Sequence, residues 1–202
     1  MIAIIDYGAG NTKSLQIALD KLNMPSILTA DPIQLKEADA IILPGVGAFK
    51  DAMDILKQSD LAAAINEAAA GGKPILGICL GMQLFYEKSF ENGEWEGLGL
   101  LKGTVSRIPN TVKVPHMGWN TLIKHLDRPI CKGVDSNAYV YFVHSYFLSS
   151  SYDKNTVVAS SHYGEPIPAI VQRENIIGMQ FHPEKSGVTG MQLLKNFREM
   201  IE

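Results

Sequence analysis

Short continuous apolar runs mark the first half of the chain, and these runs predict strands. Met1–Ile5 and Ala40–Leu43 are wholly apolar, and Pro74–Ile78 is interrupted only by a glycine. A run without polar alternation is expected for a strand that is covered on both faces of its sheet. The chain therefore begins with the strand pattern of a buried, mostly parallel sheet.

Helices are predicted between and after these strands. Residues 15–22 carry apolar side chains at helical spacing, an alanine-rich stretch over 61–70 ends at two glycines, and a helix is expected from just after 79 to about 86. The chain closes with an amphipathic helix whose apolar positions are Met191, Leu194, Phe197 and Ile201. Strands alternating with helices indicate an α/β fold with a mostly parallel central sheet flanked by helices.

The second half of the chain follows a different pattern. From Thr104 to Phe181 short strand-like segments dominate, of which Tyr139–Val143 and Asn175–Phe181 are the clearest. These segments are expected to extend the sheet or to form an antiparallel ribbon beside it, so that the second half contributes additional antiparallel strands. No repeat or linker interrupts the pattern, so a single domain over 1–202 is expected.

Composition restricts the class of protein. The chain has 202 residues, of which 46% are hydrophobic and 19% charged, which favours a folded domain over disorder. A net charge of −3 gives no sign of a nucleic-acid-binding surface. Two cysteines suit a reducing compartment, and neither a signal-peptide pattern nor an apolar stretch of membrane length is present, so a cytoplasmic protein is expected.

The segment Gly77-Ile78-Cys79-Leu80-Gly81 is the strongest candidate for a nucleophile. At a strand-to-helix junction a sharp turn lifts the central side chain above the sheet edge, and the flanking glycines avoid clashes. The helix N-terminus stabilises a thiolate at Cys79, and the Leu80 N–H points toward a developing oxyanion. The alternative is a small buried cysteine at a tight turn, which is how we interpret Cys131, a structural or surface residue.

A base for this cysteine is predicted at His182, which follows an apolar strand and begins the sequence His182-Pro183-Glu184. Pro183 favours an extended backbone at His182, so the imidazole and the Glu184 carboxylate lie on one face. Glu184 then holds one ring nitrogen while the other faces the thiol. The alternative is an ordinary surface ion pair.

A glycine-containing turn, Pro44-Gly45-Val46-Gly47, ends the second strand and opens on the same sheet edge as Cys79. Such a turn can direct an amide N–H at a reacting carbonyl oxygen, or it is an ordinary loop. Gly8 and Gly10 resemble the start of a dinucleotide fingerprint, but Lys13 occupies the third glycine position, so the match is rejected. No cofactor or metal motif is found, and none is expected.

Together these features resemble the class I (triad) glutamine amidotransferases, in the elbow over 77–83 and in the segment 178–186. The resemblance implies that Cys79, His182 and Glu184 form a triad that hydrolyses glutamine. It also implies that the Leu80 N–H and an amide of Gly45, Val46 or Gly47 hold the oxyanion. The positions that match glutamine-holding residues are Gln83, Ser145 and Tyr146.

Four further motifs, over 6–11, 44–49, 116–120 and 141–146, narrow the resemblance to one branch of this family. This branch implies a glutaminase subunit that forms a heterodimer with a (β/α)8-barrel cyclase subunit and passes ammonia to it through an internal channel. Without the partner the oxyanion hole is expected to be incomplete. Positions that match residues at or near the interface are Asn11, Trp119, Asn120, Tyr141 and Lys185.

Alternatives stay open at this point. Another amidotransferase subunit, for anthranilate, formylglycinamidine or pyridoxal phosphate synthesis, is disfavoured by the segments over 116–120 and 141–146. A hydrolase or peptidase with a cysteine elbow is disfavoured by the placement of His182 and Glu184, and a non-catalytic binding subunit by the intact triad. His144 is either structural or in contact with the thioester.

Overall fold

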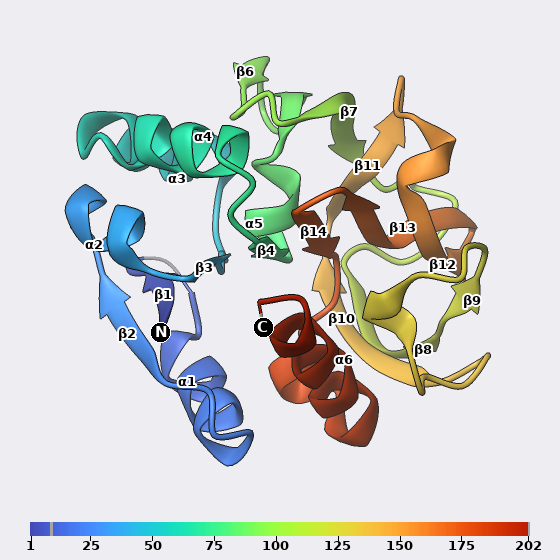
Figure 1. Cartoon of the computed structure of the whole chain (residues 1–202). Coiled ribbons are helices and arrows are strands. Elements are labelled where there is room, and N and C mark those ends of the chain that lie inside the picture. The colour runs from blue at the N-terminus through green and yellow to red at the C-terminus, as the bar shows by residue number, and fades with distance from the viewer. Residues whose placement is uncertain (9, 202) are drawn as a thin grey trace.

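The computed structural model describes residues 1–8 and 10–201, and an eight-stranded sheet forms its centre (Figure 1). The order is β2-β1-β3-β4-β14-β13-β12-β9. The strands from β2 to β14 are parallel to their neighbours, whereas β13, β12 and β9 are antiparallel. Their bounds are β1 Ile2–Ile5, β2 Ser26–Thr29, β3 Ala40–Leu43, β4 Ile75–Ile78, β9 Ile123–Lys124, β12 Val157–Tyr163, β13 Glu165–Arg173 and β14 Ile176–Met179.

Helices cover both faces of this sheet, which explains why its central strands are apolar on both sides (Figure 1). One face packs against α1 (Thr12–Lys21) and α6 (Gly187–Glu199). The other packs against α2 (Pro32–Glu37), α3 (Phe49–Gln58) and α4 (Leu61–Ala70). Alternate residues of β1 enter the two cores, and all four of them are buried. The predicted α/β fold with a mostly parallel sheet is confirmed.

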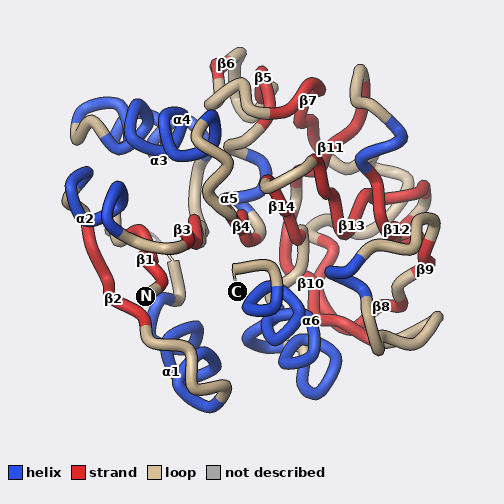
Figure 2. Tube along the Cα trace, viewed as in Figure 1, coloured by secondary structure: helices blue, strands red, loops and turns tan. Residues whose placement is uncertain are grey.

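The second half both extends the sheet and builds smaller sheets beside it (Figure 2). Strands β8 (His116–Thr121) and β10 (Tyr139–His144) form an antiparallel pair. A four-stranded sheet has the order β11-β7-β5-β6. Its strands are β5 Tyr86–Ser89, β6 Trp95–Glu96, β7 Leu101–Arg107 and β11 Tyr146–Ser150, and the short 3₁₀ turns are η1 Pro129–Cys131, η2 Lys154–Thr156 and η3 Pro183–Lys185.

The helix expected from just after 79 to about 86 is shorter than predicted. Helix α5 spans only Leu80–Gln83, and Tyr86 already belongs to β5. The carbonyl oxygens of Leu84 and Phe85 accept hydrogen bonds from Leu98 N (2.8 Å) and Leu101 N (2.9 Å). Pairing with a later segment therefore replaces the next helical turn. The elements that the sequence pattern did not predict include β2, α2, α3, β5 and β6.

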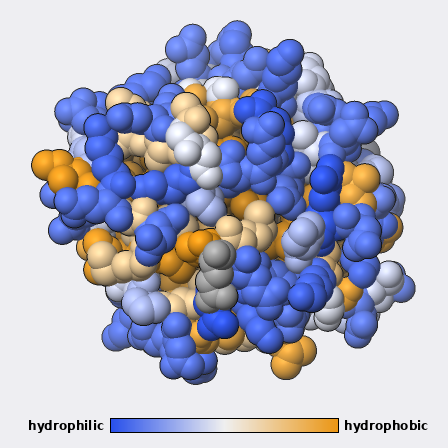
Figure 3. Space-filling model, in the orientation of Figure 1, coloured by the Kyte–Doolittle hydropathy of each residue, from blue (hydrophilic) through white to orange (hydrophobic). Residues whose placement is uncertain are grey.

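The surface seen in Figure 3 is mostly hydrophilic, with hydrophobic residues interrupted by polar ones. No helix within residues 1–8 and 10–201 is long and apolar enough to cross a membrane. The turn predicted over 6–11 includes Ala9, which lies outside the described residues.

Candidate active site

Sheet order brings three distant segments to one edge. Strands β3, β4 and β14 are adjacent and parallel, so their carboxyl ends open on the same side. Each end leads into one candidate segment: the Pro44–Gly47 turn, the elbow at Cys79, and the segment that begins at Gln180. His182 therefore comes close to Cys79 because β14 pairs directly with β4, with Met179 opposite Ile78.

The backbone at Cys79 has a conformation that residues other than glycine rarely adopt, with φ 55° and ψ −112°. The surrounding glycines make this turn possible. A Cβ at Gly77 would lie 2.7 Å from Met82 N, and a Cβ at Gly81 would overlap the Leu43 carbonyl. Such strain is typical of functional sites and is the geometry of a nucleophile elbow.

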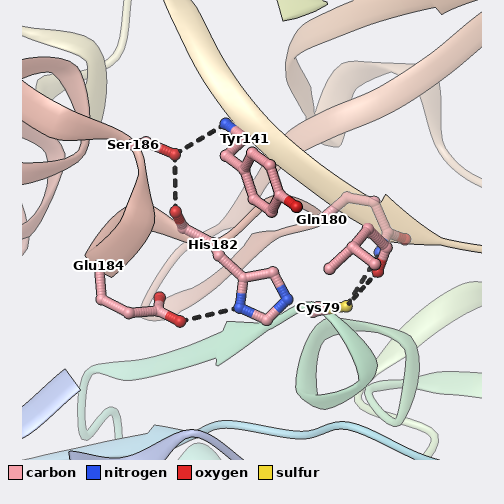
Figure 4. A network of polar contacts seen from close by, with 7 residues as sticks. Cys79, Tyr141, Gln180, His182, Glu184 and Ser186 are labelled. Atoms are coloured by element: carbon pink, nitrogen blue, oxygen red, sulfur yellow. Dashed lines mark hydrogen bonds and ion pairs between the residues drawn. The ribbon is translucent and has the colours of Figure 1, made fainter. Parts of the chain in front are cut away.

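The candidate triad lies in one buried cluster (Figure 4). His182 Nδ1 is 2.8 Å from Glu184 Oε1, and the two side chains are 4% and 3% exposed. Figure 4 shows the other imidazole edge turned toward Cys79. The Cys79 Sγ lies 3.7 Å from the Val143 carbonyl oxygen and accepts a hydrogen bond from Gln180 Nε2 at 3.8 Å.

The backbone brings His182 and Glu184 together in a different way from the one predicted. His182 itself is extended, with φ −98° and ψ 99°, as Pro183 requires. Glu184, however, lies in the 3₁₀ turn η3, and Ser186 Oγ closes this turn by donating to the His182 carbonyl oxygen at 2.6 Å. The carboxylate thus reaches the imidazole through a tight turn and not along a strand.

Charge at this cluster favours a protonated imidazole. Burial lowers the pKa of His182, but the interactions with Cys79 and with the Glu184 carboxylate outweigh burial and raise the pKa to about 10. His182 Nε2 and Glu184 Oε2 are buried without a hydrogen-bond partner among the described residues. An imidazolium that faces a cysteine sulfur is the arrangement that activates a thiol nucleophile.

A pocket of about 350 Å³ opens beside Cys79. The glycine turn forms one wall through Val46 and Gly47, and the junction of β10 and β11 forms another. The residues lining it are Val46, Gly47, Cys79, Leu80, Gln83, Glu91, Pro115, Val143, His144, Ser145 and Tyr146. A Cβ at Gly45 would lie 2.9 Å from Leu80 Cβ, so the turn packs directly against the elbow. The residues expected to hold glutamine thus share one cavity.

Two residues of this site had no role in the sequence-based expectations. Glu91 is the one carboxylate among the described residues lining the pocket, and it accepts a hydrogen bond from Phe49 N at 2.7 Å. Gln180 is fully buried and links Gln83 to the cysteine sulfur, since Gln83 Nε2 donates to Gln180 Oε1 at 3.1 Å. Gln180 lies two residues before His182, which is the one signal that could have indicated it.

The predicted interface residues surround the same sheet edge. Trp119 is 55% exposed, and its ring lies 6.0 Å from that of Tyr141 on the neighbouring strand. Lys185 is exposed in η3, and Asn11 lines a small cavity of about 10 Å³ together with His182 and Glu184. Asn120 differs, because its side chain lies on the opposite face of β8 from Trp119 and donates to the His162 carbonyl oxygen at 3.0 Å.

The other histidines and the second cysteine have no place in the triad. His144 has both ring nitrogens occupied by hydrogen bonds, whereas His125 and Cys131 lie apart from the pocket. His144 Nδ1 bonds the Tyr146 carbonyl at 2.9 Å and its Nε2 meets His116 Nδ1 at 3.0 Å. His125 is exposed and bonds Ser160, and Cys131 is buried and free. In the described part of the chain no cluster of three or more His, Cys, Asp or Glu side chains is placed to hold a metal ion.

The fold and the cysteine elbow define an α/β protein equipped for attack on a carbonyl carbon, and the comparisons identify its family. Residues 3–200 match the family model described as glutamine amidotransferase class-I, so the chain belongs to that family. The imidazole glycerol phosphate synthase subunit HisH of Oceanobacillus iheyensis is 65% identical over 201 residues, with 100% of both chains covered. The protein of the same name from a Geobacillus strain is 51% identical over 208 residues, covering 100% of this chain and 98% of that one. Within its class the chain is therefore a HisH-type subunit.

Solved structures support the same fold at lower sequence identity. A crystal structure described as a glutamine amidotransferase superimposes with a TM-score of 0.79 at 17% identity, covering 100% of this chain and 99% of that one. A structure of PurLQS from Thermotoga maritima gives a TM-score of 0.76 at 22% identity, with 100% and 98% covered. At these identities the likeness concerns the fold alone.

Proposed function

We propose that this protein hydrolyses L-glutamine to L-glutamate and ammonia through Cys79, His182 and Glu184. The observation that carries the proposal is the strained elbow at Cys79, which sits between a 350 Å³ pocket and a buried His182–Glu184 pair joined at 2.8 Å. We further propose that it supplies this ammonia to the cyclase subunit of imidazole glycerol phosphate synthase in histidine biosynthesis.

The first half of the reaction forms a thioester. The Cys79 sulfur attacks the side-chain amide carbon of glutamine, and the carbonyl oxygen becomes an oxyanion that backbone N–H groups stabilise. The Leu80 N–H and an amide of the Gly45–Gly47 turn are the donors that the packing of turn against elbow favours. When the tetrahedral intermediate collapses, protonated His182 gives its proton to the departing nitrogen, which leaves as ammonia.

The second half returns the enzyme to its starting state. A water molecule attacks the γ-glutamyl thioester while His182, now neutral, takes up a proton from it. The carbon–sulfur bond breaks, and glutamate leaves. Glu184 keeps the imidazole in one orientation throughout, because it holds Nδ1 and leaves Nε2 for the proton transfers.

Binding of glutamine needs a negatively charged group for the substrate's ammonium, and the pocket contains a carboxylate. The substrate carries an ammonium group at its α-carbon, and Glu91 is the carboxylate among the described lining residues. Phe49 N, at the start of α3, orients this carboxylate. Gln83, Ser145 and Tyr146 supply polar groups around the rest of the substrate. Burial raises the pKa of Glu91 above its usual value, and the hydrogen bond from Phe49 N opposes this shift by stabilising the carboxylate.

A partner is proposed because the similar proteins are named as a subunit of imidazole glycerol phosphate synthase, which implies a further subunit that uses the ammonia. We propose a heterodimer with a (β/α)8-barrel cyclase subunit that makes imidazole glycerol phosphate and the aminoimidazole carboxamide ribotide by-product. The exposed Trp119 and Lys185 and the half-buried Tyr141 are proposed contacts, together with Asn11, which lines a small cavity with His182 and Glu184. Exposed aromatic side chains suit the centre of an interface. The proposed place of action is the cytoplasm, and the proposed unit is one domain over 1–202.

The test uses the complex assembled with its cyclase subunit. Cys79→Ala is expected to abolish glutamine-dependent product formation and to leave ammonia-dependent formation intact, because the cyclase then receives ammonia from solution. Cys131→Ala is the matched control, since Cys131 is also buried and free but lies outside the pocket. Glutamine-dependent turnover by Cys79→Ala at the unaltered rate would refute the catalytic assignment.

A further inference from the structure

A chain of hydrogen bonds runs from strand β8 to the wall of the pocket. Asn120 Nδ2 lies 3.2 Å from His116 Nε2, His116 Nδ1 lies 3.0 Å from His144 Nε2, and His144 Nδ1 lies 2.9 Å from the Tyr146 carbonyl oxygen. Gln83 Nε2 donates to the same carbonyl at 2.8 Å. Both lone pairs of the Tyr146 carbonyl oxygen are therefore occupied, one by the hydrogen bond from His144 and the other by the hydrogen bond from Gln83.

The donor and the acceptor in each of these hydrogen bonds follow from the last member of the chain, the Tyr146 carbonyl oxygen. A carbonyl oxygen only accepts, so His144 carries its hydrogen on Nδ1. Burial lowers the pKa of His144 to about 3 and that of His116 to about 4, so both rings are neutral and have one N–H each. His144 Nε2 must then accept from His116 Nδ1, and His116 Nε2 must accept from Asn120.

The orientation of the Asn120 amide agrees with this direction independently. Its Oδ1 accepts from Thr121 N at 2.8 Å, and its Nδ2 donates to the His162 carbonyl oxygen at 3.0 Å. The nitrogen is thus the atom that faces His116. The His116 ring is also held between Phe142 and Tyr163, with ring centroids 4.5 Å and 4.0 Å away. Packing and hydrogen bonding fix the same ring position.

We propose that His116 and His144 are positioning residues for glutamine binding: their one-directional hydrogen-bond chain fixes the Tyr146 carbonyl and, through it, Gln83. This inference rests on the proposed glutaminase function. Since both nitrogens of His144 are occupied, His144 does not exchange protons with the thioester. Asn120, which lies next to the exposed Trp119 on β8, anchors the far end of the chain. The pocket wall is thereby tied to the strand that carries the proposed interface.

The first test reads the tautomers and needs no activity. Imidazole ¹⁵N shifts of the full-length protein at neutral pH are expected to show His116 and His144 as neutral Nδ1–H tautomers. His125, exposed and bonded to a serine hydroxyl that can donate or accept, is the internal comparison. An Nε2–H tautomer or an imidazolium at either buried ring would overturn the proposal.

The second test separates binding from chemistry in the assembled complex. His116→Phe keeps the stack between Phe142 and Tyr163 but removes both hydrogen bonds, and it is expected to raise KM for glutamine roughly tenfold while kcat changes less than about twofold. His116→Asn restores a donor near the Nδ1 position and is expected to recover most of the loss. His125→Phe should leave both constants unchanged.

The outcomes of the second test separate the two proposals. An unchanged KM in His116→Phe, or a fall in kcat alone, would overturn the positioning role. A wild-type complex that releases no glutamate would refute the proposed function, and the tautomer measurement would still decide the direction of the chain. Amide spectra of each variant show whether the fold is retained.

Discussion

Gly81 is where the elbow comes closest to the neighbouring strand, so Gly81→Ala tests whether this close approach sets the reaction geometry. A Cβ at this position would overlap the Leu43 carbonyl oxygen and lie 2.8 Å from its carbon. Because the obstacle is backbone, no side-chain rotation relieves it, and α5 must move away from β3 by on the order of 1 Å. Leu80 and Gln83 belong to α5 and would move with it.

We expect Gly81→Ala to lower the rate of glutamine hydrolysis strongly and to lower the free energy of unfolding less. A misplacement of about 1 Å at a reacting site costs roughly 100-fold, so glutamate release by the assembled complex should fall by about that factor in kcat/KM. Overpacking typically costs about 1–3 kcal/mol in the free energy of unfolding, which a urea titration measures. The substitution is therefore expected to inactivate a protein that still folds.

Gly71→Ala is the matched control for this experiment. Its Cβ would lie 3.4 Å and 3.5 Å from the carbonyl oxygens of Glu67 and Ala68, which is ordinary contact, and its φ is −77°. Wild-type activity is expected. A folded Gly81→Ala protein with activity within about threefold of the wild type would show that the contact with Leu43 does not hold the elbow in its reactive geometry.

Three further predictions concern the triad, the buried histidines and the interface. Glu184→Gln removes the carboxylate that helps to raise the pKa of His182, so kcat for glutamine hydrolysis should fall at least about tenfold and the pH dependence should shift to lower pH. The pKa of His116 falls from about 6.5 in the unfolded chain to about 4 when folded, so the unfolded state binds more protons as the pH drops. Stability should thus decline below about pH 6.5, by about 1 kcal/mol more from pH 7 to 5.5 than in His116→Phe, in urea titrations. Trp119→Ala, at a 55% exposed position, should weaken the cyclase complex about tenfold or more in a binding titration, without altering the stability of the free subunit by more than about 0.5 kcal/mol.

Local sequence determined the parts of the site that local physics controls. The elbow needs Gly77 because a side chain there would meet Met82 N and the Phe85 ring in the segment that follows, whereas the obstacle at Gly81 is the Leu43 carbonyl on the neighbouring strand β3. Pro183 sets the extended backbone of His182 for a similarly local reason. The sequence also predicted the buried strands, because a strand that is covered on both faces has a continuous apolar run and not an alternation of apolar and polar residues.

Only the tertiary structure decided which of these segments meet. Pairing of β14 with β4 brings His182 to Cys79, and pairing of Leu84 and Phe85 with a later segment ends α5 early, although the local pattern predicted a longer helix. Glu91 and the His116–His144 chain depend on contacts between residues far apart in sequence, so no local pattern marks them. The sequence thus determines the chemical groups, whereas strand order and register determine their distances, since these arise from hydrogen bonds between segments that the local pattern does not pair.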